Sequence, residues 1–160
     1  MPKTTNVRVK IAAVTYDLLE DGTDGEANDP IEYTTDGRLT EGEDGRMELS
    51  YEESAELGMD NSTTTLLFNT SNPRFINMSR SGGSTAGLCF NPDIPRQPCA
   101  LSTQGLSLEF VINTRRVENT VSHQGGKIEL DYTIEFHACV TERNKFRIDV
   151  TPKPTEAQRA

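Results

Sequence analysis

Residues 127–136 alternate strictly between polar and apolar side chains, and this feature constrains the fold more than any other. The apolar positions are Ile128, Leu130, Tyr132, Ile134 and Phe136. A repeat of two residues is the period of a β-strand with one face buried and the other in water. The same alternation recurs over residues 7–11, 31–33, 47–51, 106–110 and 146–150. It predicts antiparallel strands, because strands of parallel sheets are buried on both faces and show longer apolar runs.

Four further segments also have strand character, and the turns between strands are short. Strands are expected over residues 63–69, 74–80, 85–90 and 99–103, separated by pairs such as Asp36-Gly37, Asp44-Gly45 and Gly125-Gly126. Glycine accepts positive φ without steric cost, which suits such turns. Residues 52–59 show the only helical tendency, and Gly58 interrupts it. We therefore expect an all-β fold, an antiparallel up-and-down barrel of about 8–10 strands, although a β-sandwich has the same signature.

Length and charge restrict the domain count and the partners. The 160 residues suit one domain over residues 1–151, followed by a proline-containing tail over 152–160 that we expect to be disordered. A net charge of −9 disfavours nucleic acid, whose phosphates are held by clustered Lys and Arg. The N-terminal residues lack the apolar segment of a signal peptide, and no stretch is long and apolar enough for a membrane helix. The expected location is the cytoplasm.

No motif in the chain indicates a metal, a cofactor or a catalytic device. The three cysteines, Cys89, Cys99 and Cys139, form no Cys-x-x-Cys pair and suit free thiols in a reducing compartment. Neither reading frame over residues 20–32 satisfies a calcium loop, so we interpret the acidic stretch of residues 20–29 as a solvated loop. We expect no metal site, no cofactor and no assigned catalytic residue.

Polar residues on otherwise apolar strand faces are the candidate site. Alternation places Arg80 with Ile76 and Met78, and it places Thr114 and Arg116 with Phe110. A buried charge requires a partner, for which Glu53 is a candidate. The candidate ligand-binding residues are Tyr51, Glu53, Arg80, Thr114, Arg116 and Tyr132. The alternative is that these residues lie at the barrel ends or that a β-bulge turns them outward.

Several segments, taken in order, resemble the YwiB-like family of uncharacterised bacterial proteins. They are residues 50–54 (Ser-Tyr-Glu-Glu-Ser), 58–59, 63–66, 80–82, 126–132 and 144–150, and together they extend over residues 7–150. The proline-rich connection over residues 90–100 departs from the family pattern. The resemblance implies a calycin-like, lipocalin-type barrel and no established activity.

Three functions compete. The favoured one is a binding module that holds a small or amphipathic ligand inside or at the mouth of the barrel. The second is an interaction or structural protein with a filled barrel, in which outward apolar residues such as Ala12, Val14 and Val111 form a protein contact; a homodimer is one version of it. The third and least favoured is an enzyme that uses Glu52, Glu53 and Arg80 at the barrel mouth.

Overall fold

The computed structural model describes residues 3–18, 24–27, 30–52, 63–82, 84–103, 106–122, 124–136 and 139–153. These residues form eleven strands in one antiparallel sheet. The elements are β1 (Lys3–Leu18), β2 (Asp24–Ala27), β3 (Ile31–Glu41), the 3-10 turn η1 (Glu43–Gly45), β4 (Arg46–Glu52), β5 (Thr63–Asn69), β6 (Asn72–Ser81), β7 (Ser84–Phe90), β8 (Arg96–Thr103), β9 (Leu106–Asn119), β10 (Gly126–Phe136) and β11 (Cys139–Pro152).

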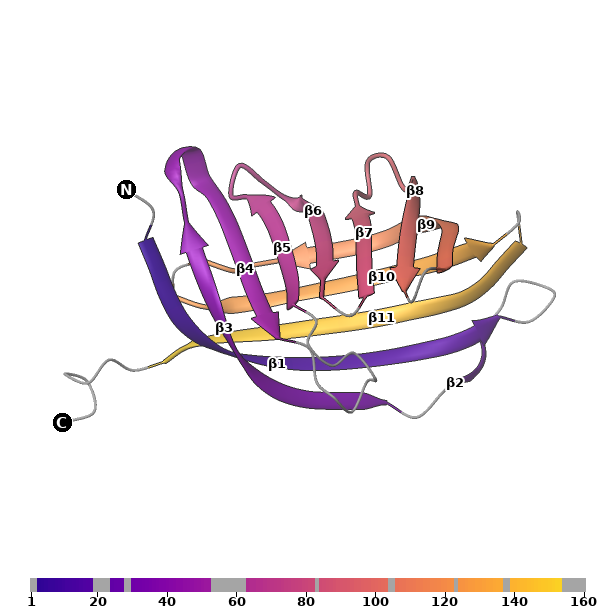
Figure 1. Cartoon of the computed structure of the whole chain (residues 1–160), viewed down its shortest axis with the longest axis horizontal. Coiled ribbons are helices and arrows are strands. Elements are labelled where there is room, and N and C mark those ends of the chain that lie inside the picture. Colours follow the sequence, from indigo (N-terminus) through magenta and orange to yellow (C-terminus); the bar gives the residue numbers. More distant parts are fainter. Residues whose placement is uncertain are drawn as a thin grey trace.

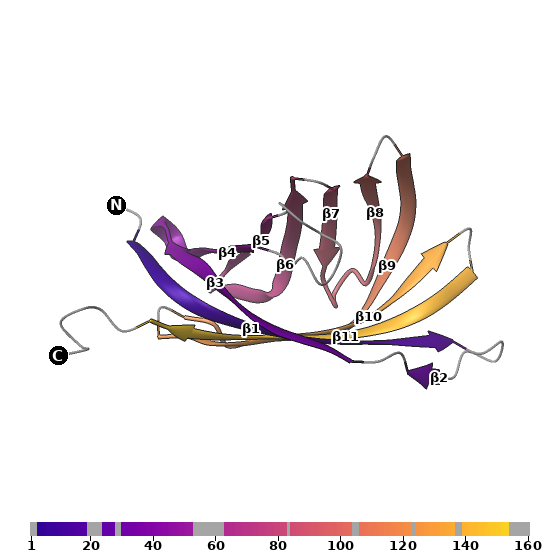
Figure 2. The ribbon, with the colours of Figure 1, turned by 60° about the horizontal axis from the view of Figure 1, so that its bottom comes forward.

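The sheet closes on itself. From β3 to β11 each strand pairs with the next, and β1 pairs with both β3 and β11. Ten strands thus form the ring, and β2 adds to the end of β1 beside Tyr16 and Leu18. The short strands β4–β8 cross the long strands β10, β11 and β1 (Figures 1 and 2). This confirms the expected antiparallel barrel, which is consistent with a calycin-like architecture.

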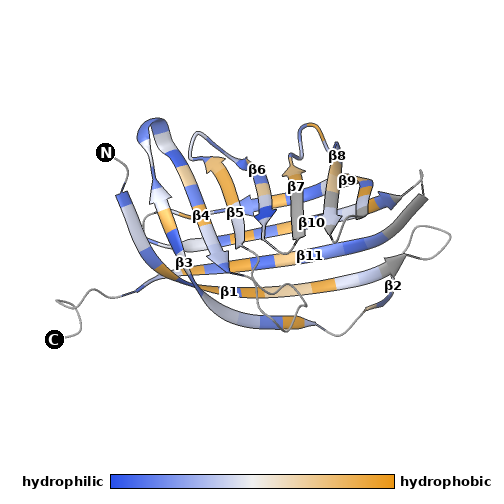
Figure 3. Ribbon diagram, in the orientation of Figure 1, coloured by the Kyte–Doolittle hydropathy of each residue, from blue (hydrophilic) through white to orange (hydrophobic). Residues whose placement is uncertain are grey.

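The alternation seen in the sequence becomes the inner and outer faces of the barrel. Apolar and polar segments alternate along the strands in Figure 3. At the seam, Ile11 of β1 pairs with Ile148 of β11, which in turn pairs with Ile128 of β10, and at most 1% of each side chain is exposed. Leu39, Leu49 and Leu66 continue the core across β3, β4 and β5. Apolar side chains therefore fill the middle of the barrel.

Two expectations about the β1–β3 region were wrong. The acidic segment that we interpreted as a solvated loop contains the short strand β2. Asp36-Gly37, expected as a turn, lies inside β3. A Cβ atom on Gly37 would lie 2.7 Å from the Ser50 carbonyl oxygen and 2.9 Å from a methyl group of Val9. Glycine is present here because three strands approach closely, which is a recognised use of glycine within a strand.

The expected turns at Gly45 and Gly125-Gly126 are confirmed by positive φ angles. Gly126, with φ of 142°, begins β10, and a Cβ atom there would lie 2.5 Å from the Thr120 carbonyl oxygen. No helix among the described residues is long and apolar enough to cross a membrane.

The tail expected over residues 152–160 begins too early, because Pro152 ends β11 and the Lys153 backbone N–H donates to the Asn6 carbonyl oxygen at 3.0 Å. Of the helical tendency over residues 52–59, Glu52 ends strand β4 instead. Residues 154–160 and 53–59 lie outside the described residues.

Candidate functional site

Four of the candidate residues lie on the inner face of the barrel. Tyr51 is 2% exposed and pairs across β4 and β5 with Thr64, which pairs with Arg80 of β6. The Nε atom of Arg80 and the hydroxyl oxygen of Tyr51 are fully shielded from solvent. Thr114 of β9 is buried and pairs with the partly buried Tyr132 of β10. Arg80 thus faces inward, as the alternation of β6 predicted.

Arg116 is a correction, because it lies on the outer face. Its side chain is 61% exposed and forms an ion pair with Glu118. Asp131 pairs with Arg116 and Tyr132 pairs with Thr114, so Arg115 is an additional residue in β9. This β-bulge reverses the inside-outside alternation, which explains why Thr114 and Val117 are both buried. Glu53, the sixth candidate, lies outside the described residues.

Two inner-face residues of β11 were missed by the sequence analysis. Asn144 pairs with Tyr132, and Glu142 pairs with Ile134. The Thr15 hydroxyl donates to the Asn144 side-chain oxygen at 2.7 Å, and the Asn144 amide donates to Glu142 at 3.3 Å. The signal was weak, because residues 141–145 are all polar and show no alternation.

We call Arg80, Tyr132, Glu142 and Asn144 the inner polar cluster. The Phe90 ring packs 4.8 Å from that of Tyr132, at a tilt of 58°. Desolvation, followed by the charge of Glu142, raises the pKa of Tyr132 to about 12, while Arg80 opposes the rise. The charges of Arg80 on β6 and Glu142 on β11 thus both act on the Tyr132 hydroxyl of β10.

The inner polar cluster lies where the barrel interior becomes accessible. Inward-facing residues in the middle of the barrel are almost completely buried, whereas Tyr132, Ile134, Glu142 and Asn144 each retain partial exposure. These four residues lie in the second half of β10 and the first half of β11, toward the connection between the two strands. The polarity of the inner face therefore rises from the apolar middle toward one mouth.

Thr114 forms hydrogen bonds with the connection between β7 and β8. Its hydroxyl accepts the Asn91 backbone N–H at 3.3 Å, and its own N–H donates to the Pro95 carbonyl oxygen at 2.9 Å. These bonds hold the proline-rich connection between β7 and β8 against β9. Thr114 is thus placed beside the inner polar cluster, while its hydrogen-bonding capacity serves the neighbouring backbone.

Two cysteines of the described part, Cys89 and Cys99, are free thiols. Burial raises the pKa of both thiols, which lowers the thiolate fraction and hence their reactivity. Within the described ranges, no group of three or more His, Cys, Asp and Glu side chains converges as a metal site would require.

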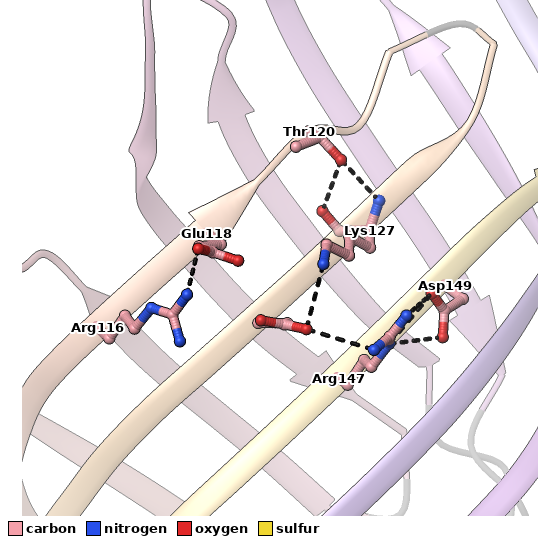
Figure 4. A network of polar contacts seen from close by, with 7 residues as sticks. Arg116, Glu118, Thr120, Lys127, Arg147 and Asp149 are labelled. Atoms are coloured by element: carbon pink, nitrogen blue, oxygen red, sulfur yellow. Dashed lines mark hydrogen bonds and ion pairs between the residues drawn. The ribbon is translucent and has the colours of Figure 1, made fainter.

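The outer face of β9–β11 carries a second polar arrangement (Figure 4). The Glu129 carboxylate of β10 forms ion pairs with Lys127 at 3.5 Å and with Arg147 of β11 at 3.4 Å. Arg147 also forms an ion pair with Asp149 at 3.0 Å. The partners come from neighbouring strands and lie on one surface. Because these groups are exposed, each pair contributes at most about 1 kcal/mol to stability.

Comparison with known proteins supports the family and the fold. The crystal structure of the ywiB protein from Bacillus subtilis has a TM-score of 0.66 against this chain at 17% sequence identity, with 91% of this chain and 92% of the other covered. At that identity the likeness concerns the fold alone. No curated protein sequence matches significantly. The model of the family DUF1934, described as a domain of unknown function, matches residues 17–148. This span is most of the chain, and it confirms the YwiB-like resemblance of the sequence: the protein belongs to the DUF1934 family.

Proposed function

We propose that the protein is a binding module that holds a small amphipathic ligand at the barrel mouth, on the inner polar cluster. The observation that carries the proposal is a set of polar side chains on inner faces, partly accessible, next to a largely apolar core. Ligand sites commonly combine an apolar wall with a few convergent polar groups. The partly exposed Ile134 offers an apolar surface, and Arg80 and Tyr132 offer hydrogen-bond donors.

The chemistry of the cluster favours a ligand with an anionic or acceptor head and an apolar body. Arg80 carries a permanent positive charge, and the Tyr132 hydroxyl stays protonated at neutral pH because its pKa is about 12. Both groups can donate to an acceptor oxygen. Glu142 is held by Asn144, which limits its repulsion of an anionic head.

Native mass spectrometry of the untagged protein, alone and with added decanoate as a model amphipathic carboxylate, tests this proposal. We expect a stoichiometric adduct that disappears on denaturation. Tyr132→Phe removes one donor and should weaken decanoate binding about fivefold. Arg74→Met is the matched control, because the Arg74 side chain is 56% exposed and its ion pair with Asp93 is long, at 3.9 Å.

A bare protein mass, both as purified and at millimolar decanoate, would reject the ligand proposal. Equal binding by wild type and by the Arg80→Met and Tyr132→Phe variants would reject the cluster as its site. The competing proposal is an interaction module with a filled barrel. The observation that favours it is a hollow on the outer face lined by Ala12 and Val14.

A further inference from the structure

A hollow of about 320 Å³ lies on the outer face of β1, β9, β10 and β11. Its apolar part contains Ala12 and Val14, two of the outward residues singled out in the sequence. Charged side chains surround them, and the complete lining is Ala12, Val14, Arg116, Glu129, Leu130, Asp131, Lys145, Phe146 and Arg147. We call it the outer hollow.

The strand register arranges this lining in rows that cross four strands. One row runs from Val14 through Lys145 and Asp131 to Arg116. Arg116 completes the row only because the bulge at Arg115 turns it outward. Neighbouring strands are about 4.8 Å apart, so the row spans roughly 14 Å, the length of four or five extended residues.

The carboxylates of the outer hollow are already neutralised by the protein. The Arg143 guanidinium donates two hydrogen bonds, of 2.9 and 2.6 Å, to the Asp131 carboxylate. Arg147 forms an ion pair with Glu129 at 3.4 Å. The lining holds three cations, Arg116, Lys145 and Arg147, and two carboxylates, Glu129 and Asp131, an excess of one positive charge. Arg116 and Arg147 also form ion pairs with Glu118 and Asp149, which lie outside the lining. Three cations, Arg143, Arg115 and Lys145, lower the pKa of the single carboxyl of Asp131, with the Arg143 hydrogen bond as the largest cause.

Lys145 is the cation best placed to meet a partner. It is exposed, pairs across the strands with Val14, and its ammonium lies 5.6 Å from the centre of the Tyr16 ring. A cation over an aromatic ring keeps its charge and has a restricted position. An apolar patch and a positioned ammonium thus lie side by side.

We propose that the outer hollow docks a short extended acidic segment of a partner protein. One apolar side chain of the segment contacts Ala12 and Val14, and carboxylates further along the segment lie near Lys145 and then Arg116. This rests on the interaction proposal and is independent of a ligand inside the barrel. The overall charge of −9 disfavours RNA more than a short segment with a few carboxylates, because RNA presents a phosphate at every nucleotide.

Fluorescence anisotropy with a labelled hexapeptide of alternating Glu and Val, at 50 mM and 300 mM NaCl, tests the proposal on the full chain. We expect saturable binding that weakens at high salt, because exposed charges are screened. Lys145→Glu and Val14→Ser should each weaken binding about fivefold or more. Arg74→Glu is the matched control, since it makes the same charge change at an exposed position of β6. Circular dichroism checks that each variant is folded.

Three results would overturn the proposal. The first is the absence of binding by the Glu-Val peptide at 50 mM NaCl. The second is equal weakening by Lys145→Glu and Arg74→Glu, which would indicate only a general charge effect. The third is tighter binding of a six-nucleotide single-stranded RNA, or self-association of the protein that the peptide fails to displace. The Tyr132→Phe variant should bind the peptide like wild type. Weakened decanoate binding with unchanged peptide binding therefore separates a failure of the ligand proposal from a failure of the docking proposal.

Discussion

Tyr132 lies where the barrel interior changes from apolar to polar, and its ionisation should report that position. Desolvation and the charge of Glu142 raise its pKa to about 12, compared with about 10 in an unfolded chain. Between these values the unfolded state releases a proton that the folded state keeps. Stability is therefore complete below pH 10 and declines as the pH rises toward 12. At pH 11 the loss due to this group should be about 1.4 kcal/mol.

Urea unfolding of wild type and of Tyr132→Phe at pH 9 and pH 11 measures this loss. The variant lacks the ionising hydroxyl and should lose about 1.4 kcal/mol less than wild type over this interval. The other tyrosines are common to both proteins and cancel in the comparison. Identical losses in the two proteins would show that the hydroxyl is solvated and that the inner polar cluster is not as dry as its geometry indicates.

Residue alternation was sufficient to predict an inward Tyr51, Arg80, Thr114 and Tyr132. It could not reveal Glu142 and Asn144, because a segment of uniformly polar residues has no apolar phase from which to assign its faces. The same limitation explains Arg116. Residues 115 and 116 are both arginine, so the sequence carries no sign of which one the bulge inserts. Alternation assigns residues to the inner or outer face of a strand only where apolar residues lie both before and after a β-bulge.

The β-bulge in β9 provides a prediction at the level of a single strand. Val117 and Val121 are buried after the bulge, as Ile112 and Thr114 are before it. Deleting Arg115 would remove the bulge and leave Thr114 inward, Arg116 outward and Val117 inward in regular alternation, with the pairing to β10 retained. Because no side chain changes face, the deletion should be tolerated and should cost at most about 1 kcal/mol of stability.

Arg115→Ala is the control for this deletion. It keeps the residue count of β9 and changes only an exposed side chain, so it should alter stability by at most about 0.5 kcal/mol. Thermal unfolding followed by circular dichroism compares the two variants. If the deletion were far more destabilising than the alanine variant, β9 would need the additional residue itself, and the regular pairing of Thr114, Arg116 and Val117 with β10 would not be sufficient to hold the strand.

At the scale of the whole molecule, composition and alternation predicted an antiparallel barrel but left its closure open. Strand patterns and turns identify neighbours along the chain, such as β9 and β10. The pairing of β1 with β11 joins segments more than a hundred residues apart, from Val7 with Pro152 to Asp17 with Glu142. No local signal specifies such a pairing. It follows from the requirement that a sheet bury its inner face and leave no open edge.

Closure should make the barrel unfold as one unit, and Ile148 at the seam tests this. Ile148 is completely buried between Ile11 of β1 and Ile128 of β10, so Ile148→Ala should cost about 2–4 kcal/mol. Leu108→Ala, at a residue that is 48% exposed, should cost far less.

The apolar residues of all ten ring strands share one core. In the Ile148→Ala variant, hydrogen exchange of β5 and β6 should therefore accelerate by the same free energy by which the substitution lowers global stability. Unchanged protection of β5 and β6 in a destabilised Ile148→Ala variant would mean that the short-strand wall survives when the seam opens. In that case the mouth beside Tyr132 could widen without loss of the fold, and ligand entry would require only a local opening of β10, β11 and β1.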